Sequence, residues 1–195
     1  LKYAGENGVV IFGILMYVSL IFTAVFVGYS NGIGPVFSYH YGAQDHEELK
    51  NLRKRSLEII AVTSVSMFVL SELLARPYSL LFLQNAEDLL PEAVHMFHII
   101  SVSYLFTGIA IFSSAMFTAL NNGLVSALIS FLRTFVFELG AVLLLPPLFG
   151  VDGIWYSVVF AELMAAVVGA IFMAALLRQY QYCIMEIADL HFAKV

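Results

Sequence analysis

Charged residues are scarce in this chain. Asp, Glu, Lys and Arg make up only 12% of its 195 residues, whereas soluble domains carry about 25%. Hydrophobic residues make up 61%, and the mean hydropathy is +0.91. No charge occurs between Glu6 and Asp45, or between Glu92 and Arg133, and both gaps far exceed the roughly 18 apolar residues that indicate a bilayer span. These features exclude a soluble enzyme domain and a disordered chain, and they indicate an integral membrane protein.

Basic residues and cysteine are also few. Nine Lys and Arg against 14 Asp and Glu give a formal net charge of −5, which offers no basic field for nucleic acid. The single Cys183 has no partner for a disulfide within the chain and no metal-ligand spacing. Residues 1–8 are polar and precede an apolar run longer than a signal sequence uses, so no cleavable signal peptide is predicted. Because the chain begins with Leu1, we expect a piece of a longer product or a trimmed chain.

Long apolar runs are what the chain has in abundance, and they predict five transmembrane helices. Each run exceeds the roughly 20 residues that cross about 30 Å of hydrocarbon. The fold class is therefore all-α, a polytopic helix bundle within residues 1–180, followed by a tail at 181–195. The predicted spans cover about residues 9–42, 56–83, 92–120, 124–145 and 153–177, with a short polar linker at 44–50 and breaks at 121–123 and 145–147.

Lysine and arginine gather at one end of the predicted bundle. Residues 44–55 carry four of them and the tail carries Arg178 and Lys194, whereas only Lys2 and Arg76 lie at the opposite end. The positive-inside rule therefore predicts that the 44–55 linker and the C-terminus are cytoplasmic. Five spans then place the N-terminus outside, and the odd number indicates that a further helix precedes them.

Three ionisable residues inside the predicted spans are candidates for a substrate or ion pathway. Glu138 lies in the middle of the fourth span, where a charge costs roughly 2.5–3.5 kcal/mol. Arg133 comes five residues earlier, about 140° around an ideal α-helix, so we expect the two side chains to meet different neighbours or water. Glu162 in the fifth span has two open alternatives, an ion pair with Arg133 or a hydrogen bond to a backbone break. For all three, a structural polar clamp is the alternative to a functional role.

Small residues in the first span predict close helix packing and a hinge. Gly28 and Gly32 are four residues apart and form one GxxxG face. Gly34 and Pro35 are expected to add a bend, because proline removes a backbone donor and clashes with the preceding turn. A broken, glycine-rich helix is typical of the moving walls of transporters. Tight packing without motion is the alternative.

Metal and catalytic sites are not predicted. His95 and His98 share a helix face, but a third ligand and an HExxH pattern are lacking. The sequence contains neither GxSxG nor a glycine-rich phosphate loop. We therefore expect no metal, no cofactor and no enzyme. Glu72 and Arg76, at i and i+4, predict an ordinary ion pair on one helix face.

Several segments together resemble the multidrug and toxic compound extrusion (MATE) family. NGIGPVFSYHYGA at 31–43 resembles the glycine-rich second helix of that family's C-terminal lobe. FTALNNG at 117–123 resembles the turn after its tenth helix, and SFLR at 130–133 resembles its eleventh. LLLPPLFGVDGIW at 143–155, followed by Ala161-Glu162, resembles the passage into its twelfth. The likeness extends over about residues 5–180, with the segments in the family's order.

The resemblance implies twelve transmembrane helices in two six-helix lobes around a central cavity, in a bacterial cytoplasmic membrane. It also implies export of drugs or organic cations in exchange for H⁺ or Na⁺. This chain then covers helices eight to twelve, and its partners are the bilayer, the substrate, and the absent N-terminal lobe and seventh helix. Arg133 and Glu162 fall where the family has these residue types. Glu138 falls where many relatives are apolar, and His40 where Asn is common.

The leading hypothesis is therefore the C-terminal part of an efflux antiporter, which we do not expect to transport alone. Glu138 is expected to lend negative charge to the cavity wall. Apolar contact is expected from Phe112, Met116, Phe131 and Phe135, since aromatic and methionine side chains adapt to varied ligands. Two alternatives remain: a non-transporting membrane scaffold that assembles through the Gly28 and Gly32 face, and, less favoured, a membrane-embedded enzyme.

Overall fold

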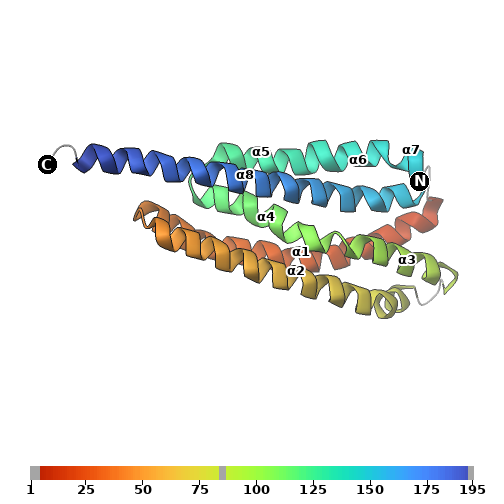
Figure 1. Cartoon of the computed structure of the whole chain (residues 1–195). Helices are drawn as coiled ribbons and strands as arrows, with labels where there is room; N and C mark the ends of the chain where they lie inside the picture. Colours follow the sequence, from red (N-terminus) through yellow and green to blue (C-terminus); the bar gives the residue numbers. More distant parts are fainter. Residues whose placement is uncertain (1–4, 84–86, 193–195) are drawn as a thin grey trace.

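The computed structural model describes residues 5–83 and 87–192, and side chains as far as residue 175 except those of residues 6, 7 and 87. The chain is an elongated bundle of long helices that run alongside one another (Figure 1). Every described element is helical, which confirms the all-α prediction. In chain order the elements are α1 (Gly5–Gly42), α2 (His46–Phe82), η1 (Glu87–Leu89), α3 (Leu90–Ser101), α4 (Tyr104–Ala119), α5 (Gly123–Phe131), η2 (Leu132–Glu138), α6 (Leu139–Leu144), α7 (Pro146–Phe149) and α8 (Asp152–Phe192).

Four described helical stretches are long and apolar enough to cross a membrane. They are Gly8–Gly42, His46–Phe82, Gly123–Phe149 and Asp152–Ala175. A fifth is formed by α3 and α4 together, which the sequence predicts as one span; a bend of 43° divides them at Val102 and Ser103. The predicted tail at 181–195 begins inside α8, and the side chain of Cys183 lies outside the described ones.

The start of α2 differs from the prediction. The helix begins at His46, so the expected linker at 44–50 is wrong beyond Asp45. Asp45 caps the helix, because its Oδ1 accepts a hydrogen bond from the backbone N–H of Glu48 at 3.1 Å. Gln44 makes the turn with a φ of 57°. The polar residues that follow are mostly good helix formers, so they extend the apolar span towards the turn.

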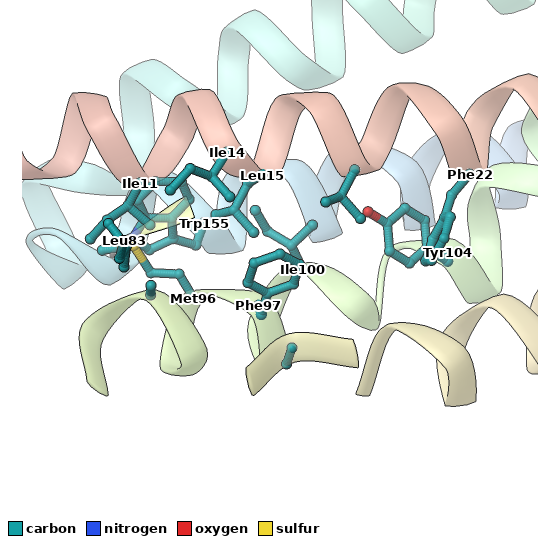
Figure 2. Packing of buried hydrophobic residues seen from close by; sticks show 13 residues of the cluster. Ile11, Ile14, Leu15, Phe22, Leu83, Met96, Phe97, Ile100, Tyr104 and Trp155 are labelled. Carbon is teal, nitrogen blue, oxygen red and sulfur yellow. The ribbon is translucent and has the colours of Figure 1, made fainter. Parts of the chain in front are cut away.

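Two hydrophobic clusters occupy the two ends of the bundle. The first joins the start of α1, the end of α2, α3 and the start of α8, with Trp155 beside Ile11 and Met96 (Figure 2). The second joins the end of α1, the start of α2, the end of α4, and α5, and it buries Phe112 and Met116 almost completely. The expectation that these two side chains line a cavity is therefore wrong. They are core residues.

Glycine mediates close helix packing at positions that the sequence did not single out. A Cβ added to Gly108 on α4 would lie 2.7 Å from Cε1 of Phe26 and 2.8 Å from Cγ2 of Ile60. A Cβ added to Gly169 on α8 would collide with the side chain of Ser113. These glycines allow α4 to approach α1, α2 and α8 at once.

The glycine face of α1 has no such neighbour. A Cβ added to Gly28, Gly32 or Gly34 would have no heavy atom within 4 Å, leaving aside the adjacent residues and the nearby backbone of the same helix. The close contact expected for these residues is therefore not made within the described chain. Helix α1 continues through Pro35 to Gly42. Small residues in a sequence show where another helix can approach closely, but they do not identify that helix.

Candidate functional site: a polar groove beside a buried ion pair

The middle of the fourth span is a π-helical segment, η2, which carries both Arg133 and Glu138. The backbone N–H of Leu139 reaches back to the carbonyl of Thr134, five residues earlier. In such a segment residues five apart lie nearly one above the other, because the hydrogen bonds run from i to i+5. The α-helical angle of about 140° expected between Arg133 and Glu138 therefore does not apply. The composition of the segment carries no signal for this wider turn.

Arg133 forms an ion pair with Glu162 on α8. The distances to Oε1 of Glu162 are 2.6 Å from Nη2 and 3.2 Å from Nε. The sequence left open whether Glu162 pairs with Arg133 or hydrogen-bonds to a backbone break, and the structure shows the ion pair with Arg133. The side chains are 27% and 14% exposed, so the pair is largely shielded from solvent. It ties the π-helical segment to α8.

The second oxygen of Glu162 is left without a hydrogen bond. Oε2 is buried and makes no hydrogen bond of ordinary geometry with the described residues, although the hydroxyl of Thr107 acts on the same carboxylate. A buried acceptor without a partner costs about 1–3 kcal/mol, and more when it is charged. This oxygen is therefore a place where a proton or a small cation would be favourable.

Glu138 lies on the exposed surface of the bundle. Among the described residues it has no ion-pair partner within 4.0 Å, although its charge acts on Glu162. It does not line the groove described next. Glu138 therefore does not charge the wall of this groove, and its expected place at the wall of a cavity between two lobes stays a prediction.

A groove of about 330 Å³ lies between α1, α4 and the fourth span. Most of its hydrogen-bonding groups are uncharged, and Arg133 is the one ionisable side chain among its described lining. The groove can therefore make hydrogen bonds to a small solute, and its charge depends on the Arg133–Glu162 pair. The lining residues are Thr23, Val27, Asn31, Ala110, Ile111, Ser114, Ala115, Thr118, Ile129, Ser130, Arg133 and Thr134.

A hydroxyl network that the sequence analysis missed holds one wall of the groove. The Oγ of Ser114 lies 2.9 Å from the Oγ of both Ser126 and Ser130, and Thr118 Oγ1 lies 2.7 Å from Ser126 Oγ. These bonds join α4 to α5 across the turn at 121–123. The sequence does carry a signal, since 114 and 118 on one helix and 126 and 130 on the next are both i, i+4 pairs of hydroxyl residues.

Phe131 and Phe135 lie outside the groove as well. Their rings stack with centroids 5.3 Å apart and planes at 11°, and both are more than half exposed. Together with the burial of Phe112 and Met116, this means that none of the four expected apolar side chains lines the groove.

A second polar cluster joins α2, α3 and α8 at the opposite end from the basic start of α2. Glu72 Oε2 lies 2.6 Å from His98 Nδ1, and its Oε1 accepts a hydrogen bond from Ser101. Glu72 and Arg76 are not within ion-pair distance of each other, so the expected i, i+4 pair is wrong. Within the described part of the chain, no three His, Cys, Asp or Glu residues are placed to hold a metal.

Long apolar helices around a polar groove and a largely shielded ion pair define a polytopic integral membrane protein. The MatE family model matches residues 1–142, so the chain belongs to the MatE family. The resemblance stated from the sequence is confirmed. No curated protein gives a match.

Solved transporter structures share this fold. An outward-facing multidrug resistance MATE family transporter of the MOP superfamily superposes with a TM-score of 0.86 at 20% identity, over 92% of this chain and 41% of its own. An inward-facing structure of a multidrug resistance MATE family transporter superposes with a TM-score of 0.85 at 21% identity, over 92% of this chain and 42% of its own. A MOP superfamily transporter from Pyrococcus furiosus, described as having a binding pocket of reverse polarity, gives 0.83 at 21%, over 90% and 40%. The chain thus spans about two fifths of the length of the structures it matches.

Proposed function

We propose that this chain forms helices eight to twelve of a two-lobe antiporter. The complete transporter exports small organic solutes, often cationic, in exchange for H⁺ or Na⁺. Membership of the MatE family and the fold shared with multidrug transporters support this function. In such a transporter two lobes rock about a central binding site. The chain contributes one wall of that site and does not transport alone.

The observation that carries this proposal is the position of the Arg133–Glu162 pair beside the groove. Arg133 lines the groove, while Glu162 neutralises it from behind. A proton on Glu162, or a sodium ion at its Oε2, offsets the carboxylate charge and leaves the guanidinium cationic at the groove wall. At an effective dielectric constant of 20, two unit charges about 4 Å apart interact by about 4 kcal/mol.

Coupling follows from this change of charge. A cationic solute in the groove is disfavoured while the coupling ion is bound, because it meets an unneutralised arginine. The coupling ion is disfavoured while the solute is bound, since linkage is reciprocal. Mutual exclusion of two ligands is what exchange requires.

The test is Glu162→Gln in the complete transporter, with Glu138→Gln as the matched control. Glutamine mimics the protonated acid, so Glu162→Gln is expected to remove the dependence of efflux on the H⁺ or Na⁺ gradient and to slow export of a cationic dye at least tenfold. Glu138→Gln removes an exposed carboxylate and is expected to have a much smaller effect. Dye efflux from vesicles with imposed gradients, normalised to the amount of protein, measures both. Gradient-dependent export by Glu162→Gln at the wild-type rate would contradict the proposal.

We further propose a bacterial cytoplasmic membrane as the location, with the basic residues of 44–55 and the C-terminus on the cytoplasmic side. The turn at 43–45 and the start of α2 carry the basic cluster that supports this orientation. Single cysteines at Gln44 and Asp88 in a Cys183-free background test it. An impermeant maleimide added to intact cells is expected to label position 88 and to spare position 44, and the reverse pattern would overturn the orientation.

A non-transporting scaffold is the second candidate, and the open glycine face of α1 favours it. The scaffold predicts that this chain associates with itself and that bulky residues at positions 28 and 32 prevent the association. The transporter predicts that the same substitutions leave the mass of the chain in detergent unchanged and impair efflux by the complete protein. Light scattering of Gly28→Leu/Gly32→Leu decides between the two.

A further inference from the structure

Two histidines on α3 each contact a carboxylate on a different helix. His98 Nδ1 lies 2.6 Å from Oε2 of Glu72 on α2, and His95 Nε2 lies 3.5 Å from Oδ1 of Asp152 at the start of α8. The two side chains of His95 and His98 are 58% and 47% exposed, so water and protons reach both rings. Helix α3 is therefore held from two sides by contacts that become ion pairs only when imidazole is protonated.

A bend separates helix α3 from its continuation α4. The break at Val102 and Ser103, with its 43° bend, separates α3 from α4, and the backbone there makes turn hydrogen bonds such as Ser103 N–H to Ile100 O. What keeps α3 in place is its packing through Met96 and Phe97 into the cluster shown in Figure 2, together with the two histidine contacts.

We propose that His95 and His98 form a proton-binding clamp that seats α3 against α2 and α8. Imidazole changes its charge between about pH 5 and 8. When both rings are charged, each forms a charge-assisted contact with its carboxylate. When both are neutral, His98 keeps at most a hydrogen bond to Glu72, and the charges of Glu72 and Asp152 lose their counterparts. Each partly exposed pair changes the ratio of seated to unseated α3 by about two- to fivefold.

No other ionisable group described near α3 replaces Glu72 or Asp152 as the partner of a histidine. Among the described residues, no further carboxylate lies within ion-pair distance of either histidine. Ser101, on the same helix, donates to the other oxygen of Glu72 and fixes that carboxylate towards His98. At this end of the bundle, the other ionisable side chains described on α2, η1, α3, α4 and α8 are Arg76, Tyr78, Asp88, Glu92, Tyr104 and Tyr156, whereas the charged residues at the start of α2 and Glu162 on α8 lie farther along their helices.

The clamp lies at the end of the bundle away from the basic start of α2 (Figure 1). With the proposed orientation its protons come from outside the cell. The clamp itself does not depend on that orientation or on the proposed transport function.

A native probe reports on the position of α3. Trp155 is the one tryptophan of the chain, is 1% exposed, and belongs to the same cluster as Met96 and Phe97. It follows Asp152 by one helical turn. Unseating α3 exposes the indole to water, which shifts its emission to longer wavelength and opens it to acrylamide.

The experiment is tryptophan emission and acrylamide quenching of the full chain in lipid nanodiscs between pH 5 and 8. We expect the emission to be blue-shifted and poorly quenched at pH 5 and to move to longer wavelength with stronger quenching by pH 8. The double variant His95→Gln/His98→Asn replaces each contacting nitrogen with a neutral amide and is expected to lose this transition. His40→Gln is the matched control, because His40 contacts Asp45 at the opposite end of the bundle, and it is expected to keep the transition.

Substituting the two carboxylates, Glu72 and Asp152, tests the same pH-dependent transition independently of the histidines. Glu72→Gln/Asp152→Asn keeps both histidines and removes their partners, so it is also expected to abolish the transition. The absence of a transition in the unaltered chain, or its survival in both double variants, overturns the clamp. Neither result bears on transport, since the signal reports on the packing around Trp155 and not on movement of a solute.

Discussion

Arg133 directs two donors, Nε and Nη2, at the same oxygen of Glu162, and the other, buried oxygen of that carboxylate makes no hydrogen bond of ordinary geometry. A bidentate pair would use both oxygens and satisfy both partners. The arrangement here leaves one buried acceptor open and one guanidinium edge at the groove. This asymmetry is the reason for the proposed role of the pair in ion coupling.

The first prediction concerns the stability that this pair confers. Arg133→Met leaves a shielded carboxylate without its counter-charge and is expected to destabilise the chain by about 1–3 kcal/mol, below the 3–5 typical of fully buried pairs because Arg133 is partly exposed. Arg133→Met/Glu162→Leu removes both charges and is expected to regain most of that loss. Thermal unfolding in detergent measures the double-mutant cycle. A loss in the double variant equal to the sum of the losses in Arg133→Met and Glu162→Leu would show that the two residues are not coupled.

The second prediction separates packed glycines from open ones. Gly108→Val would force a side chain against Phe26 and Ile60 and is expected to cost about 1–3 kcal/mol or more. Gly28→Ala is the control, because nothing lies near position 28, and replacing an exposed helical glycine is expected to stabilise by up to about 1 kcal/mol. Melting temperatures of the purified variants check both. A lower melting temperature for Gly28→Ala in this chain would mean that its glycine face is covered.

The third prediction distinguishes core aromatic residues from surface ones. Phe112 is fully buried against the end of α1, with its ring 5.9 Å from that of Phe37, so Phe112→Ala is expected to cost about 3–5 kcal/mol. Phe131→Ala removes an exposed ring and is expected to cost less than about 1 kcal/mol. Chemical denaturation followed by helix content gives both values. Comparable losses in the two variants would contradict the assignment of Phe112 to the core.

The spans could be read from the sequence because helix formation in lipid is a local requirement. Without water, each backbone polar group must be satisfied within its own helix, so an apolar run of sufficient length becomes a helix whatever surrounds it. The first span, predicted at 9–42, is α1 at Gly5–Gly42, and α2 ends at Phe82, close to the predicted 83. The start of α2 was misplaced because hydropathy reports burial in lipid, whereas the Asp45 cap begins the helix.

The choice of partners could not be read in the same way. The i, i+4 spacing on α2 predicted an ion pair between Glu72 and Arg76. In the structure, Glu72 instead contacts His98 and Ser101 on the neighbouring helix α3. The π-helical turn at η2 changes the angle around the helix axis between Arg133 and Glu138, and no residue preference in the sequence predicts this turn. Glu162, by contrast, was among the candidates from the start, because an ionisable residue inside a span needs a partner.

Hydropathy and charge alone therefore settled that this chain is a helical membrane protein and marked the residues that had to be explained. Packing decided what each of them does. It paired Arg133 with Glu162, left Glu138 on the surface, buried Phe112 and left the glycine face of α1 open. Helices in a bilayer form before they choose neighbours, and the choice depends on side-chain shape and polar contacts between segments far apart in the sequence.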